Sequence, residues 1–161
     1  MLDAIGKGEP EVYACEVLGA DALLDQDELV ARERWEQALA VGSTNPAVLY
    51  ELCEMDRREL FHEFDMYYRL PDETAAKLRG RLTKLGETKA LQSWVYELLA
   101  WVEGTANHPN IANINLVQRN MARVKEKNAT LLLLSVCHMR LNDAQGARAM
   151  LDSLDKANPS G

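Results

Sequence analysis

Few residues in this chain have the types and the spacing that catalysis or metal binding requires. His62 and Glu63 are adjacent, but a helical zinc site needs a second histidine three or four residues later, and none stands there. Cys137 and His138 are also adjacent, and neighbours on a helix point about 100° apart. The sequence has no glycine-rich phosphate loop and no serine or cysteine elbow. We therefore expect no catalytic residue, metal or cofactor, and no enzyme, unless the fold brings His62, His108 and the cysteines together.

The cysteines indicate a reducing compartment. Cys15, Cys53 and Cys137 are far apart in the sequence, and each stands in an apolar helical context. An odd number without paired spacing argues against a disulfide framework. Residues 1–12 also lack the apolar core flanked by positive charge of a secretory signal. We therefore expect buried free thiols in a cytoplasmic protein.

The clearest structural signal is the stretch 11–46, which predicts two helices folded back on each other. Within 30–41 the apolar residues follow the i, i+4, i+7, i+8 spacing of one helix face: Val30, Ala31, Trp35, Ala38, Leu39 and Val41. The segment 12–24 repeats this pattern with Ala14, Cys15, Leu18, Ala22 and Leu23. A short polar link joins the two, and its Asp27 is the expected N-cap of the second helix. Because the link is short, the helices must run antiparallel and cover each other's apolar stripe.

Small residues stand where these two helices would cross, and a large ring stands beside them. Gly19 and Ala22 lie on the first helix, and Ala31, Trp35 and Ala38 lie on the second. This arrangement resembles the tetratricopeptide repeat, a 34-residue helical hairpin unit. Leu18-Gly19 matches the family's Leu-Gly pair, and residues 31, 35 and 38 match its Ala, aromatic, Ala series. The chain departs from the family at Cys15, Ala22, Gln26 and Pro46.

The same sequence pattern recurs near the other end of the chain, in residues 129–159. Leu131 and Leu134 lead the first helix, Asn142-Asp143 makes the turn, and Pro159 ends the unit. The residues expected to face back from the second helix are Ala147, Leu151 and Leu154. These positions keep the mutual spacing of their counterparts in the first hairpin. The resemblance therefore covers about 65 residues at the two ends of the chain, and the middle only by its number of helices.

Between these hairpins the sequence predicts further helices and little else. Ala, Leu, Glu, Arg and Met dominate, and these residues favour helix. A helix should begin at Pro46, and others should span 56–70, 73–85, 88–103 and 111–127, with a polar loop at 104–110. We predict an all-α fold in which antiparallel helix pairs stack as a short tetratricopeptide-like superhelix. It should contain about seven to eight helices in a single domain spanning residues 1–161.

The resemblance implies that the first helix of each pair lines a groove that binds another protein or a peptide segment. On the family register, the groove-facing residues are Tyr13, Val17, Leu23, Leu24, Leu132, Leu133, Val136, Met139 and Arg140. Because this set is mostly apolar, an apolar or amphipathic segment would be held by burial. The size, acidity and repeat content also resemble the small cytoplasmic chaperones of type III secretion translocators. We therefore expect a chaperone or adaptor. An equally weighted alternative is that neighbouring helices cover these leucines.

A second class of function is self-association as a structural or assembly subunit. The stretch 56–70 is the most aromatic in the chain, and 88–103 is apolar nearly all round. A helix of the latter kind is buried on more than one side, either in a core or in a homodimer. The residues of this candidate oligomer surface are Phe61, Phe64, Tyr68, Trp94 and Trp101.

The charge distribution excludes one class of partner. The net charge is −7, and it arises within residues 1–30, which hold eight acidic residues and one lysine. The other 131 residues carry seventeen acidic and seventeen basic side chains. Phosphate contacts need a basic field, so we expect no nucleic-acid partner. The acidic part could favour solubility or meet a basic partner. No apolar run of about 18 residues exists, so we expect no membrane insertion.

Overall fold

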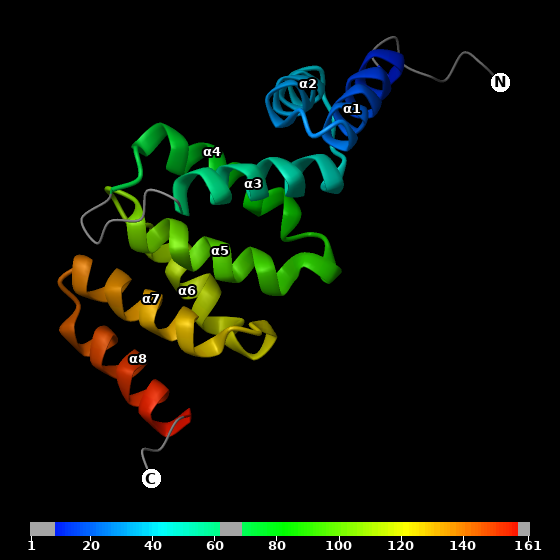
Figure 1. Cartoon of the computed structure of the whole chain (residues 1–161). Helices are drawn as coiled ribbons and strands as arrows, with labels where there is room; N and C mark the ends of the chain where they lie inside the picture. The colour runs from blue at the N-terminus through cyan, green and yellow to red at the C-terminus, as the bar shows by residue number, and fades with distance from the viewer. Residues whose placement is uncertain (1–8, 62–68, 158–161) are drawn as a thin grey trace. The chain divides into compact units, whose positions relative to one another are not determined.

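The computed structural model of this chain describes residues 9–61 and 69–157. Within these ranges the chain forms eight α-helices and two short 3-10 helices, and no strand beyond an isolated bridge (Figure 1). The all-α prediction is therefore confirmed. The chain divides between residues 63 and 64 into two compact units, and each is described by itself. The stacking into a superhelix and the single domain stay predictions.

The first unit is a helical hairpin with a third helix packed on it. It consists of α1 (Glu9–Leu24), α2 (Glu28–Ala40) and α3 (Pro46–Phe61), blue to cyan in Figure 1. Its core joins residues of α2 and α3: Ala31, Trp35, Val48, Leu52 and Met55. The helix expected to begin at Pro46 and the first part of the helix expected over 56–70 form one continuous helix, α3, which runs to Phe61.

Local capping sets the ends of these helices, at Asp27 and Pro46 as the sequence predicts. Asp27 caps α2, with its Oδ1 accepting from the amide of Val30 at 3.1 Å. Gly42 follows α2 with φ 104°, a conformation that side chains rarely adopt. Asn45 then accepts from the amide of Ala47 at 3.0 Å, and Pro46 is the first residue of α3. These three local features fix where α2 begins and ends and where α3 begins.

The second unit is built around one buried helix. It consists of α4 (Asp72–Leu85), η1 (Lys89–Leu91), α5 (Gln92–Thr105), α6 (Ile111–Arg119), η2 (Met121–Arg123), α7 (Lys127–Arg140) and α8 (Ala144–Ala157). The central helix is α5, which packs against α4, α6 and α7, while α8 covers another side of α7 (Figure 1). Ten residues of α5 are buried, as its apolar sequence indicates.

Two predicted boundaries in this unit are wrong. Gly104 and Thr105 belong to α5, although the sequence placed them in a polar loop. Thr105 is accommodated in the buried helix because its hydroxyl donates to the carbonyl of Trp101 at 2.9 Å, and its own carbonyl accepts from Leu70 at 2.9 Å. The predicted helix 111–127 instead ends at Arg119. There the side chain of Asn120 donates to the carbonyl of Leu116 at 2.8 Å.

The hairpins α1–α2 and α7–α8 share one turn geometry. Gln26 and Asn142 both have positive φ, 62° and 57°. The following aspartates, Asp27 and Asp143, donate their amides five residues back, at 2.9 and 2.8 Å. Both aspartates also accept an amide of the next helix, from Val30 and from Gly146. The repeated sequence pattern at the two ends therefore corresponds to a repeated local structure.

No helix in the ranges 9–61 and 69–157 is both long and apolar enough to cross a membrane.

Candidate functional site

In the first unit, one side of α1 is an apolar stripe that faces solvent. Tyr13 is 70 % exposed, Val17 46 % and Leu24 83 %, and Ala20 between them is also exposed. Leu23 differs from the other predicted groove residues because it packs against the core of α2 and α3. Three of the four predicted groove residues on α1 are therefore accessible.

The opposite side of α1 is fastened to the rest of its unit. Cys15 and Gly19 are buried there, and the indole Nε1 of Trp35 donates to the carbonyl of Glu16 at 3.2 Å. The Glu16 carboxylate accepts from the hydroxyl of Ser43 and, at 3.0 Å, from the side-chain amide of Asn45. These bonds tie α1 to the link between α2 and α3, so the exposed stripe stands on a fixed helix.

In the second unit, α7 presents a similar exposed stripe. Leu132 is 48 % exposed, Val136 36 % and Met139 57 %. The other two predicted groove residues face inward: Leu133 is half-buried against Gly104. Arg140 donates to the carbonyls of Gly104 and Asn107, at 2.8 and 3.3 Å. Arg140 therefore holds the end of α5 rather than pointing into open solvent.

Of the candidate oligomer surface, the structure describes the side chains of Trp94 and Trp101. Trp101 is only 3 % exposed and lies in the core of the second unit, which is the core alternative of the two that the sequence left open for this helix. The core of the chain itself covers the Trp101 ring, as is usual for a large apolar side chain. Trp94 is half-buried. The side chain of Phe61 and residues Phe64 and Tyr68 lie outside the described residues.

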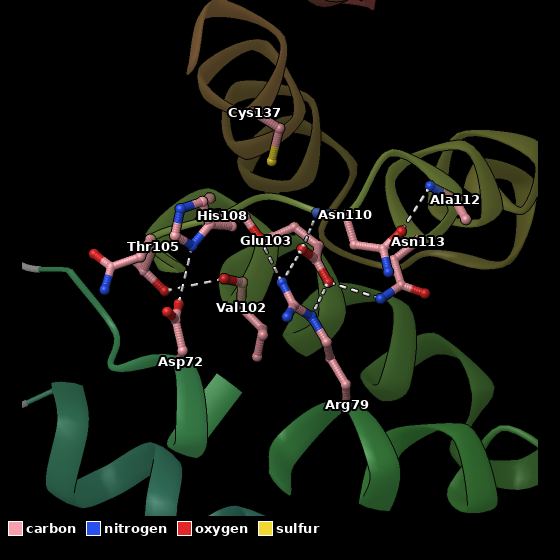
Figure 2. A network of polar contacts seen from close by, with 12 residues as sticks. Asp72, Arg79, Val102, Glu103, Thr105, His108, Asn110, Ala112, Asn113 and Cys137 are labelled. Atoms are coloured by element: carbon pink, nitrogen blue, oxygen red, sulfur yellow. Dashed lines mark hydrogen bonds and ion pairs between the residues drawn. The ribbon is translucent and has the colours of Figure 1, made fainter. Parts of the chain in front are cut away.

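A network of polar contacts surrounds Glu103, which is completely buried (Figure 2). Its Oε1 accepts from Arg79 Nε at 2.8 Å and from the side-chain amide of Asn113 at 2.7 Å. Its Oε2 accepts from Arg79 Nη2 and from the backbone amide of Asn110, both at 2.7 Å. Arg79 also donates to the carbonyl of His108 at 2.9 Å. One carboxylate therefore joins α4, α5, the loop after α5 and the start of α6.

Donors within the chain occupy both oxygens of this carboxylate. Each oxygen of Glu103 accepts from two donors, so a metal ion could bind there only after a hydrogen bond is broken. The pKa of Arg79 is raised by its hydrogen bond to Glu103, which keeps the guanidinium charged. At the exposed rim, His108 Nδ1 lies 3.3 Å from Asp72 Oδ1 (Figure 2).

Sequence reasoning missed the Glu103 centre, although a signal was present. Glu97 and Glu103 are the acidic residues of an otherwise apolar helix, and a buried charge must find a partner. Glu97 is half-buried, and its Oε1 accepts from the Ser93 hydroxyl at 2.9 Å and from the backbone amides of Lys125 at 2.9 Å and Glu126 at 3.1 Å, just before α7. The sequence cannot name either set of partners, because they come from distant elements.

Cys137 and His138 point to different neighbours, as expected for adjacent residues on a helix. Burial, together with the nearby charge of Glu103, raises the pKa of the Cys137 thiol to about 12. His138 is buried, with Nδ1 2.8 Å from Asp143 Oδ2 and Nε2 2.8 Å from the amide nitrogen of Gln118. Because its pKa is this high, the Cys137 thiol stays protonated at neutral pH and is a poor nucleophile. His62 lies outside the described residues.

Among the described residues, no group of three or more His, Cys, Asp or Glu side chains could hold a metal ion.

No protein-family model, no curated protein and no solved structure matches this chain. The chain's own surfaces are therefore the basis for assigning a function.

Proposed function

We propose that this protein is a non-catalytic polypeptide-binding module, chaperone- or adaptor-like, that holds an apolar or amphipathic segment of a partner protein. One observation carries the proposal: the first helix of each of two hairpins exposes a row of large apolar side chains. On α1 these are Tyr13, Val17 and Leu24, and on α7 they are Leu132, Val136 and Met139. Covering such surface releases about 25 cal/mol per Å² before the costs of association.

The backbone under both stripes supports this proposal because it is held in place. Trp35 and Glu16 tie α1 to its unit, and Arg140 and Glu97 tie the two ends of α7 to α5 and the chain that follows it. A surface that is already ordered loses little conformational entropy when a partner binds. Neither stripe has the paired titratable groups that a catalytic function would need.

The local architecture also supports a helical-repeat scaffold of the tetratricopeptide kind. In the second unit, α5 packs on both α6 and α7, and α7 packs on the helix that follows it, α8. The turns of α1–α2 and α7–α8 are alike in backbone conformation and in capping. We propose a cytoplasmic location on the ground that Cys15, Cys53 and Cys137 are all free and buried.

Site-directed photo-cross-linking tests the proposed function. A photoreactive residue placed at Val17 or at Met139 should give adducts of one or a few discrete masses in an extract of the source cells. The same residue at Glu33 or Lys156, exposed positions on α2 and α8, is the matched control. Adducts restricted to the apolar stripes support the proposal. Equal labelling at all four positions, or none, would contradict it.

The same experiment separates binding from assembly. If the adducts join two copies of this chain, and the solution mass doubles to match, the protein acts by self-association instead. Light scattering across a dilution series supplies that mass.

A further inference from the structure

We propose that the exposed stripe of α1 binds a basic amphipathic helix, one whose apolar seam is flanked by lysine or arginine. This inference rests on the proposed function and names the chemistry of the partner at one of the two apolar surfaces. The stripe consists of Tyr13, Val17, Ala20 and Leu24, and all four side chains are exposed.

The spacing of the stripe favours a helix as the bound form. Its members follow one another at intervals of four, three and four residues, which is the a/d spacing of a coiled-coil seam. Such a seam receives the apolar side chains of a second helix laid along it. The opposite side of α1 is already occupied, since Cys15 and Gly19 there are buried. The stripe is therefore a helix-sized apolar surface with one free side.

Charge decides which helix fits. Residues 9–27, which form α1 and the following link, contain six acidic residues and no lysine or arginine: Glu9, Glu11, Glu16, Asp21, Asp25 and Asp27. Glu16 and Asp27 are engaged in hydrogen bonds within the unit. Asp21 and Asp25 are exposed, stand four residues apart and run alongside the stripe. A partner with cations beside its seam would be attracted to the C-terminal end of α1.

A depression next to this row strengthens the charge argument. It encloses about 270 Å³ between α1 and α2, with Leu18, Ala22 and Val30 among its lining residues and Asp21, Asp25 and Asp27 at its acidic part. Arg34 also lines it and donates to Gln37 at 3.3 Å. A depression lined by apolar and acidic side chains suits the aliphatic stem and charged end of a lysine or arginine.

The same charges argue against two other occupants. In a pair of identical α1 helices, the residues flanking both seams would be acidic, and like charges facing each other are unfavourable. An anionic lipid surface would be repelled for the same reason. Apolar exposure alone would fit any of these partners, and the acidic row selects the basic helix.

The test uses the full chain and two synthetic helical peptides with identical leucine seams. One peptide carries lysine at the flanking positions and the other carries glutamate there. Fluorescence anisotropy should show the lysine peptide binding about tenfold more tightly or better at low salt. The difference should shrink as salt rises, because exposed charges are screened.

Variants locate the binding surface. Tyr13→Ser with Leu24→Ser should abolish binding, and both side chains are exposed enough that helical circular dichroism should be unchanged. Asp21→Lys with Asp25→Lys should reverse the preference toward the glutamate peptide. Leu151→Ser on α8, a 41 % exposed apolar residue outside both stripes, is the matched control and should leave the affinity unaltered.

The outcomes separate this inference from the function on which it rests. Equal affinity for the two peptides, or binding unaffected by the α1 variants, would overturn the basic-helix assignment. A cross-link from Val17 to Val17 of a second copy would overturn it in favour of self-association. If neither peptide binds while Val17 or Met139 still captures a discrete partner, the inference fails and the proposed function stands. If both experiments give nothing, both fail.

Discussion

Gly19 of α1 lies directly against the indole of Trp35 on α2. A Cβ atom at residue 19 would overlap the ring, with Trp35 Cε2 only 2.9 Å away and Nε1 and Cδ1 closer still. The same Nε1 donates to the carbonyl of Glu16 one turn earlier. The two helices can therefore approach this closely only because residue 19 has no side chain.

The first prediction follows from this contact. Gly19→Ala should lower the free energy of unfolding by about 1–3 kcal/mol, because the added methyl forces Trp35 from its position. Urea denaturation followed by circular dichroism measures the loss. Gly80→Ala is the matched control: a Cβ there meets nothing within 4 Å, and residue 80 lies inside α4. That substitution should stabilise by about 0.5–1 kcal/mol, through helix propensity alone. Equal effects at the two glycines would show that the Trp35 contact is unimportant.

A second prediction concerns the buried ion pair of Glu103 and Arg79. Glu103→Gln should destabilise the chain by about 3–5 kcal/mol, because it leaves the guanidinium without its counter-charge and places an amide donor opposite other donors. Glu28→Gln, which removes a carboxylate from an exposed pair with Arg58, should cost at most about 1 kcal/mol. Urea denaturation of both variants makes the comparison. Similar small losses would mean that the Glu103 centre is dispensable.

The third prediction is a pH dependence that arises at Asp143. The pKa of this carboxyl is lowered, first by the amide of Gly146 and then by His138. A carboxyl whose pKa is lower in the folded state stabilises the fold above its unfolded pKa, about 3.9, and loses this contribution as pH falls toward the folded value. Asp143→Asn should therefore lower the melting temperature at neutral pH and leave it nearly unchanged in strong acid. Asp152→Asn, an exposed carboxyl later on α8, is the control and should show little of this dependence. A gap between wild type and Asp143→Asn that does not close in acid would contradict the assignment.

The fourth prediction concerns the thiols. Cys15, Cys53 and Cys137 are each at most 5 % exposed, and burial with the charge of Glu103 raises the pKa of Cys137 to about 12. Iodoacetamide at neutral pH should modify the native protein slowly and the urea-unfolded protein rapidly at all three positions. Mass spectrometry of timed samples measures the rates. Rapid modification of native Cys137 would show an accessible thiolate, and would reopen a nucleophilic role for this residue.

Local rules in the sequence predicted much of the secondary structure and one accessible surface. Asp27, Gly42 and Asn45 act on amides and dihedral angles within a few residues, so their roles could be inferred without a fold. The resemblance to the tetratricopeptide repeat likewise placed Tyr13, Val17 and Leu24 on the groove side of this helix, although only the structure shows that this side is open. The same reasoning failed at Thr105, where a bond to distant Leu70 keeps a polar residue inside the helix.

What the sequence determined by itself is the set of helices, their turns and the acidic charge of α1, because each depends on neighbours along the chain. Only the tertiary structure decided which apolar side chains are buried. Trp101 and Leu24 are both large and apolar, yet one is 3 % exposed and the other 83 %. The partners of Glu103 were equally beyond the sequence, since Arg79, Asn110 and Asn113 meet it from separate elements. A buried charge requires a partner, but the folded arrangement of α4, α5 and α6 supplies it.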